Sequence, residues 1–168
     1  MSGRISPDPN DRMGVFKRLA DVPDRYRLKQ HAAAYDGEDT YNEYLIEKLL
    51  PDHPDATDKY RKSVQRAGRR WKAHMDERGR HHALATPEDV EAWCTNLLDG
   101  HTVNTACAEY WLRIEGFYSW LQAHPQHPHT YHPVWMAVAQ YPESKVVWNS
   151  KLNNGDRLDD GWEVTADE

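Results

Sequence analysis

The sequence predicts an all-α fold: a four-helix bundle preceded by one or two short helices, with flexible termini. Three observations support this prediction. Apolar residues recur at the spacing of a helix face through the middle of the chain. Capping residues, prolines and glycines stand where such helices would begin and end. Strand patterning is almost absent outside residues 145–148.

The N-terminal residues 1–38 are predicted to form a polar arm that is partly helical. The first 20 or so residues are polar with scattered Pro, Asp and Gly, which favours a mobile segment. Pro23 then suits the first turn of a helix that runs through Tyr35, and Gly37 would close it.

Residues 39–142 are predicted to form the helical domain. Asp39 or Thr40 can cap its first helix, which runs to Leu50 and is ended by Pro51. The residues of that helix that recur at helical spacing are Tyr41, Tyr44, Leu45, Lys48 and Leu49.

The next predicted helix begins near Ala56 or Thr57 and stops at Gly79. One face carries a narrow apolar stripe, and the other faces are strongly basic. The stripe consists of Tyr60, Val64, Ala67, Trp71 and Met75.

Cations are concentrated between Lys59 and His82. Nine of them stand against only Asp76 and Glu77, so this window carries about +7 in a chain whose net charge is −6. A localised cationic face on an acidic protein is typical of a site for a polyanion, although most charge runs are simply solvated surface. The nine are Lys59, Arg61, Lys62, Arg66, Arg69, Arg70, Lys72, Arg78 and Arg80.

Three further helices complete the predicted bundle. Thr86 followed by Pro87 is a strong start signal for a helix that Gly100 ends. Thr102 or Thr105 caps the longest helix, which His124-Pro125 stops, and Pro133 opens a short one through Tyr141. Their core positions are Val90, Trp93, Cys94, Leu97 and Leu98, then Tyr110, Trp111, Ile114, Phe117, Tyr118 and Leu121.

The composition bounds the class of protein. With 168 residues and 39% apolar content the chain has one domain's worth of core. No run approaches 18 apolar residues and the N-terminus has no apolar signal region, so we expect a cytoplasmic protein without membrane contact. Residues 143–168 are acidic and are predicted to be a disordered tail. Cys94 and Cys107 lie within helical patterns, which favours reduced, buried thiols.

Four histidines in a Pro-rich loop raise the possibility of a zinc site. No Cys or acid is near them in the sequence, and the intervening prolines hold the segment extended. We therefore expect no metal and no cofactor. The histidines are His124, His127, His129 and His132.

Four motifs follow one another along the predicted domain: Thr57-x-x-Tyr60-Arg61-x-x-Val64, Thr86-Pro87-Glu88-Asp89-Val90-x-x-Trp93, Tyr110-x-x-x-Ile114-x-x-Phe117-Tyr118-x-Trp120-Leu121, and His132-Pro133. This ordered set resembles the core-binding, SAM-like domain of tyrosine recombinases and phage integrases. The chain departs from the family at Ala67 and Gly68, where a large aromatic is usual, and at Thr102 and Thr105, which straddle the expected start of the third helix.

The resemblance does not extend to catalysis. The family's catalytic domain supplies an Arg, a Lys, a His-x-x-Arg pair, a further His or Trp and a Tyr nucleophile. No His-x-x-Arg occurs in this chain, so we expect no such enzyme activity.

The resemblance instead implies a non-catalytic DNA-binding module that acts in, or modulates, DNA integration or recombination. Its expected partner is double-stranded DNA, with a separate recombinase catalytic chain as a further candidate. The alternative is a helical protein-interaction adaptor that does not bind DNA. The candidate DNA-binding residues are Arg61, Lys62, Arg66, Arg69, Arg70, Lys72 and Thr105.

Overall fold

The computed structural model describes residues 16–153, and all regular structure in this range is helical. The all-α prediction is therefore confirmed. The outermost parts of both predicted flexible termini, residues 1–15 and 154–168, lie outside the described residues.

The segment after residue 16 forms short turns of helix instead of the continuous helix predicted from Pro23 to Tyr35. The backbone is extended at Val22 and at Arg27, which interrupts the helix on both sides of Pro23. Gly37 ends the segment in the left-handed conformation, with φ of +81°. The turns are η1 (Leu19–Asp21), η2 (Asp24–Tyr26) and η3 (Leu28–His31), followed by α2 (Ala32–Tyr35).

The helix predicted from residue 39 or 40 is continuous through α3 (Thr40–Tyr44), the π-turn η4 (Leu45–Leu49) and α4 (Leu50–Asp52). The Asp39 carboxylate caps it by accepting a hydrogen bond from the Asn42 N–H at 3.1 Å. Its N-terminal end is thus fixed by the predicted side chain.

Two glycines let this helix pack closely on its neighbours. The Tyr41 ring lies directly against Gly68 in α5 (Asp58–Glu77), and a Cβ there would overlap the ring. The Tyr41 hydroxyl also donates to the Val64 carbonyl oxygen at 2.8 Å. The Tyr44 hydroxyl lies 2.7 Å from the place a Cβ of Gly116 would take. The aromatic ring absent from position 68 is therefore supplied by another helix.

The helix α5 begins and ends as the sequence predicts. The Thr57 hydroxyl accepts a hydrogen bond from the Tyr60 N–H, and Gly79 terminates the helix with φ of +78°. The Arg80 N–H reaches back to the Met75 carbonyl oxygen at 3.1 Å, which closes the C-terminal turn. Four residues of the predicted stripe are buried: Val64, Ala67, Trp71 and Met75.

The next helix, α6 (Pro87–Gly100), has a capping box in which Thr86 and Asp89 satisfy each other's backbone N–H groups. Thr102 then caps one continuous helix formed by α7 (Val103–Thr105), the π-segment η5 (Ala106–Trp111) and α8 (Leu112–Ala123). The chain leaves it at His124.

The segment after Pro142 contradicts the prediction of a disordered tail from residue 143. It forms α10 (Pro142–Asn153), which follows α9 (Pro133–Gln140) and packs against α6, α7, α9 and η5. Val147 and Trp148 are fully buried, and the Trp148 ring meets the Trp111 ring at 5.9 Å between centroids. The predicted four-helix bundle therefore gains a fifth major helix.

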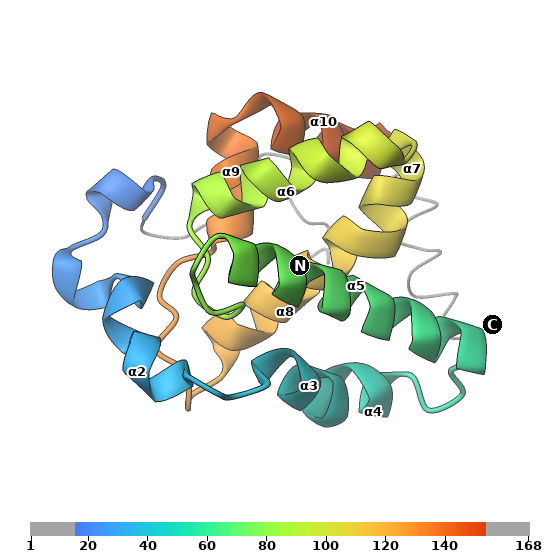
Figure 1. Cartoon of the computed structure of the whole chain (residues 1–168), viewed down its shortest axis with the longest axis horizontal. Coiled ribbons are helices and arrows are strands. Elements are labelled where there is room, and N and C mark those ends of the chain that lie inside the picture. The colour runs from blue at the N-terminus through green and yellow to red at the C-terminus, as the bar shows by residue number, and fades with distance from the viewer. Residues whose placement is uncertain (1–15, 154–168) are drawn as a thin grey trace, which may run out of the picture.

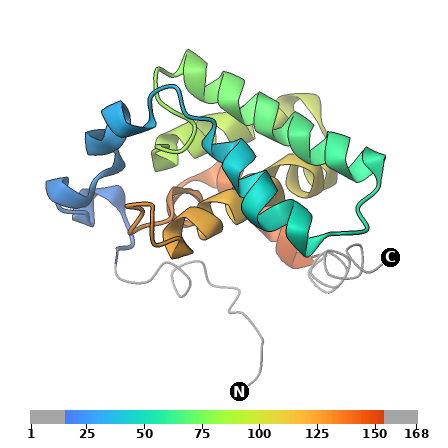
Figure 2. The ribbon, with the colours of Figure 1, turned by 90° about the horizontal axis from the view of Figure 1, so that it is seen from below.

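The helices surround one aromatic core. In Figure 1, α5 crosses the middle of the molecule, with α6 above it and the α3–α4 helix below it. Figure 2 shows the α3–α4 helix alongside α5 from another side. Helix α8 packs beneath α5, and α9 and α10 cover α6. This arrangement leaves one long face of α5 uncovered. The largest fully buried side chains include Trp71, Trp111, Trp148, Tyr41, Tyr118 and Phe117.

Candidate nucleic-acid interface

The uncovered face of α5 carries exposed cations. Lys62, Arg66 and Arg69 lie four and three residues apart, so they project from one face of the helix, opposite the buried stripe. None of the three forms an ion pair with any residue between 16 and 153. We call these three side chains the crest of α5.

The crest is flanked on the α6 side by Arg70. Its guanidinium lies over the Tyr110 ring at 5.4 Å, a cation–π contact that orients the side chain while leaving it exposed. A groove of about 380 Å³ runs beside it between α5 and α6, and Arg69, Arg70 and Asn96 contribute to its lining. Positive charge therefore continues from the crest into this groove.

On the opposite flank the predicted site residues are less available. Arg61 is half-buried. The Lys72 ammonium donates to both carboxylate oxygens of Asp39, at 3.0 and 3.1 Å. Burial raises the pKa of Asp39, but hydrogen bonds from Lys72 and from the Asn42 N–H outweigh it and lower the pKa. Lys72 therefore ties α5 to the start of α3.

The cations at the C-terminal end of the basic window are neutralised. Arg78 and Arg80 both donate to the fully buried carboxylate of Asp89, with Arg80 Nε 2.7 Å from Oδ2. Burial raises the pKa of Asp89, but these hydrogen bonds and one from the Thr86 N–H lower it to about 2. Arg78 and Arg80 thus join the end of α5 to the start of α6.

Thr105 is not part of the cationic face. It lies at the end of α7, where its backbone N–H and its hydroxyl oxygen both bond to the Thr102 hydroxyl, at 3.2 and 3.1 Å. Thr105 therefore takes part in capping this helix and lies on a different helix from the cations of α5.

The loop between α5 and α6 is fixed by hydrogen bonds that the sequence did not indicate. His82 Nε2 accepts the N–H groups of Thr40 and Tyr41, both at 3.1 Å, at the buried start of α3. Its carbonyl oxygen accepts from the Trp71 indole and the Tyr118 hydroxyl, both at 2.8 Å. Burial, His81 and Lys72 lower the pKa of His82 to about 3, so the ring is neutral at pH 7.

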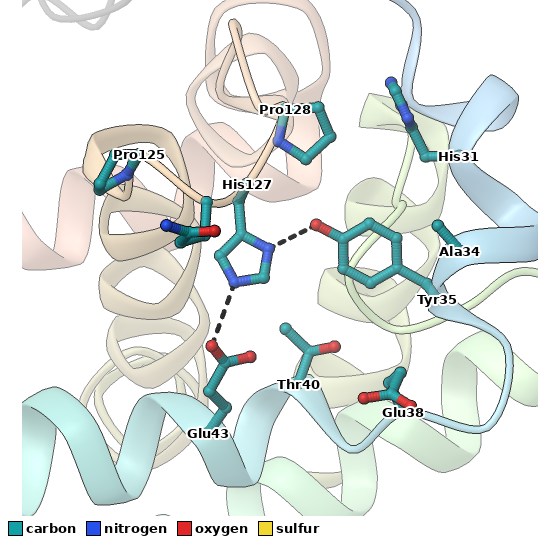
Figure 3. A pocket seen from close by; sticks show the side chains of 10 residues that line it. His31, Ala34, Tyr35, Glu38, Thr40, Glu43, Pro125, His127 and Pro128 are labelled. Atoms are coloured by element: carbon teal, nitrogen blue, oxygen red, sulfur yellow. Dashed lines mark hydrogen bonds and ion pairs between the residues drawn. The ribbon is translucent and has the colours of Figure 1, made fainter.

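The four histidines of the Pro-rich loop divide into a buried pair and a more accessible pair whose rings contact each other. His129 and His132 are buried, and His132 caps α9 by accepting the Trp135 N–H. Burial lowers the pKa of His129 to about 4 and that of His132 to about 3. His124 and His127 turn instead toward carboxylates of the α3–η4 helix, as Figure 3 shows for His127 and Glu43.

The thiols are buried and are not joined in a disulfide. Burial raises the pKa of Cys94 to about 12, against the lowering effect of a hydrogen bond from the Ser144 hydroxyl. A thiol of that pKa is not an activated nucleophile at neutral pH.

Comparison of the chain with protein-family models, with curated proteins and with solved structures returned no significant match in any of the three. Among the described helices, none is both long and apolar enough to cross a membrane.

Proposed function

We propose that this chain is a non-catalytic module that binds double-stranded DNA through the crest of α5. It resembles the core-binding half of a tyrosine recombinase, and we place its action in DNA integration or recombination. The observation that carries the DNA-binding proposal is the row of exposed cations on α5, a helix whose other side is buried, and none of these cations forms an ion pair within residues 16–153. The role in recombination rests on the sequence resemblance.

The crest is suited to phosphates because its cations have no other partner among the described residues. A cation already paired with a carboxylate must give up that partner to bind a phosphate, whereas Lys62, Arg66 and Arg69 need only release water. They span roughly 10 Å along the helix axis, given a rise of about 1.5 Å per residue. That length suits a short stretch of one backbone, with Arg70 at its edge.

The overall acidity of the chain does not prevent this binding. Screening limits the reach of exposed charges to about 8 Å at physiological ionic strength, so distant carboxylates contribute little. Asp39 and Asp89 are already paired with cations of the same window. On α5 itself three exposed acids, Asp58, Asp76 and Glu77, are outnumbered by the six cations that are not paired with Asp39: Lys59, Arg61, Lys62, Arg66, Arg69 and Arg70. The local field over the crest is therefore positive.

The exposed aromatic and apolar side chains give less support to the alternative, a protein-interaction adaptor. Among residues 16–153 no tryptophan side chain is exposed, since four are buried and Trp120 and Trp135 are half-buried. The most exposed large apolar side chain is Ile46, at 62%. Four other large apolar side chains among residues 16–153 are exposed at 37–41%: Tyr26, Val103, Val146 and Leu152. Exposed apolar side chains of this kind are common on monomeric proteins and do not by themselves form a docking surface.

The experiment is a titration of a fluorescent DNA duplex with the full-length chain across a salt series. Each phosphate contact adds about 0.9 to the slope of log K against log salt. Replacing Lys62, Arg66 and Arg69 together by Gln should therefore flatten the slope by about 2–3, because three contacts are lost.

The matched control removes three exposed cations from other helices, Arg25, Lys29 and Lys145, and should change the slope by less than about 1. Lys151 is unsuitable as a control because its ammonium is buried against the Glu115 carboxylate. If the parent fails to bind at low salt, or if the crest variant binds like the parent, the DNA-binding proposal is wrong. The adaptor hypothesis would then replace it.

A further inference from the structure

A mixed cluster of carboxylates and imidazoles lies away from the crest of α5. Glu43 and Glu47 stand four residues apart on the α3–η4 helix, so both point to the same side. They meet His124 and His127, which follow the end of α8. The expectation of no metal rested on the lack of acids near these histidines in the sequence, and the fold supplies two.

The spacing of the polar atoms matches a metal site. His124 Nε2 is 3.3 Å from a Glu47 oxygen, and His127 Nε2 is 3.4 Å from a Glu43 oxygen. One donor atom from each of Glu43, Glu47 and His124 lies within 4.8 Å of the other two. Zinc bonds of about 2.0–2.2 Å in a tetrahedron place donor atoms about 3.3–3.6 Å apart, so these three donor atoms need to approach one another by only about 1–1.5 Å. His127 is not part of this group of three and touches it through Glu43, so its ring must move toward Glu47 and His124 to complete the site.

The cluster is held in place yet remains open to solvent. The His124 and His127 rings contact each other and the Trp120 ring, with centroids 4.9 to 5.3 Å apart. The exposed fractions of the side chains are 9% for His127, 16% for His124, 36% for Glu43 and 47% for Glu47. An ion could therefore reach the cluster without unfolding.

We propose that Glu43, Glu47, His124 and His127 bind a Zn²⁺ ion. Two imidazoles and two carboxylates are a donor set that zinc accepts, and the two negative charges balance the ion. The ion would also relieve the repulsion between two carboxylates on adjacent turns of one helix.

The second nitrogens of the two rings respond differently to zinc. Both Nε2 atoms must offer a lone pair, so each Nδ1 must carry the proton. His127 Nδ1 is hydrogen-bonded to the Tyr35 hydroxyl (Figure 3), which can reverse from donor to acceptor and so support the ligand. His124 Nδ1 accepts the Gln126 N–H at 3.0 Å, and that bond must break. Tyr35 is therefore a positioning residue for His127.

The test uses the full-length chain without a polyhistidine tag, stripped of metal and titrated with Zn²⁺ by calorimetry. The expected result is one ion per chain, with a rise in Tm. The double variant Glu43→Gln and Glu47→Gln should bind at least about 100-fold more weakly, because two charged ligands become neutral amides. Tyr35→Phe should weaken binding by about 10-fold, in the range seen when the hydrogen-bond partner of a ligand is removed.

His31→Ala is the matched control, since His31 lines the adjoining cavity of about 530 Å³ but lies outside the proposed ligand set (Figure 3). Its zinc affinity should equal that of the parent. Co²⁺ provides a measurement on the parent alone, because tetrahedral coordination gives strong visible absorption and octahedral coordination gives weak absorption. Weak absorption, absence of saturable zinc binding, or equal binding by the folded double variant would overturn the proposal.

Discussion

The cations of the basic window fall into two groups that the fold uses in opposite ways. Lys62, Arg66 and Arg69 in the middle of α5 are exposed and make no ion pair within residues 16–153. Arg78 and Arg80, just beyond its end, share the fully buried carboxylate of Asp89. The two groups are separated by less than three turns of helix.

The net charge of a segment is therefore a different quantity from the charge that it can offer to a binding partner. The window carries about +7 by sequence, but the ion pairs to Asp39 and Asp89 employ three of its cations in holding helices together. Removing a cation should therefore weaken either ligand binding or folding, according to its group.

The largest effect is expected from Asp89→Ala. The substitution leaves Arg78 and Arg80 without their carboxylate and removes one half of the Thr86 capping box. Breaking a buried ion pair by deleting one partner typically costs about 3–5 kcal/mol, and we expect a loss of stability in that range. Urea unfolding monitored by circular dichroism would measure it.

Glu88→Ala is the control for Asp89→Ala, because Glu88 lies in the same first turn but is exposed. Its effect should stay within about 0.5 kcal/mol, as for ordinary surface changes. Equal effects from the two substitutions would mean that the Asp89 cluster does not join the two helices.

The second prediction concerns pH and the same α5–α6 connection. His82 has a pKa of about 3 in the folded chain, because burial, His81 and Lys72 disfavour its charged form while Asp39 only partly offsets them. In the unfolded chain the His82 side chain binds a proton near the ordinary histidine pKa of 6.5. The contribution of the neutral ring to stability is therefore fully present above pH 6.5 and is lost as the pH falls toward 3. Between pH 7 and pH 4, we expect the titration of His82 to lower the free energy of unfolding by up to roughly 3 kcal/mol.

His82→Gln sharpens this prediction, since an amide oxygen can still accept the Thr40 and Tyr41 N–H groups but does not titrate. Urea unfolding at several pH values should show a shallower decline from pH 6.5 to pH 4 in the variant. Asp89, with a folded pKa of about 2 against an ordinary 3.8, adds a separate loss at lower pH. An unchanged pH profile in the variant would remove His82 as the cause.

Local signals explain the part of the fold that the sequence predicted correctly. Thr57, Thr86 and Thr102 each cap a helix through their own hydroxyl, and His124 ends one as expected. Such signals act within a few residues and are readable in order along the chain. The all-α class followed from them.

The prediction of a disordered tail from residue 143 failed because α10 is stabilised by contacts with residues that are distant in the sequence. The buried side of α10 includes Ser144, Ser150 and Lys151, so its hydropathy shows no helical stripe. Lys151 is accommodated because its ammonium pairs with Glu115, 36 residues away. A polar residue in a core is not visible as such until its partner is placed.

The candidate sites also differ in whether local spacing or contacts between distant residues determine them. Helical spacing in the sequence places the crest cations on a different face from the apolar stripe, and the structure shows all three exposed. Lys72 was expected on the same surface, but its pairing with Asp39, 33 residues away, changes its role. The proposed zinc ligands are further apart still, at 77 residues for Glu47 and His124. The relative positions of side chains on one helix can be predicted from the sequence. Those of side chains on different helices are known only once the fold is known.

Substitutions of the crest cations are expected to change stability least. Lys62→Gln, Arg66→Gln and Arg69→Gln should each alter stability by no more than about 0.5 kcal/mol, because these side chains are exposed and make no ion pair with described residues. The double variant Arg78→Gln and Arg80→Gln should lose stability yet change the salt slope of DNA binding by less than about 1 at temperatures where it stays folded. Unfolding curves and duplex titrations on the same preparations would measure both quantities. If Arg78 and Arg80 prove as important for DNA binding as the crest, the Asp89 cluster opens on contact with DNA, and the separation into two groups does not hold.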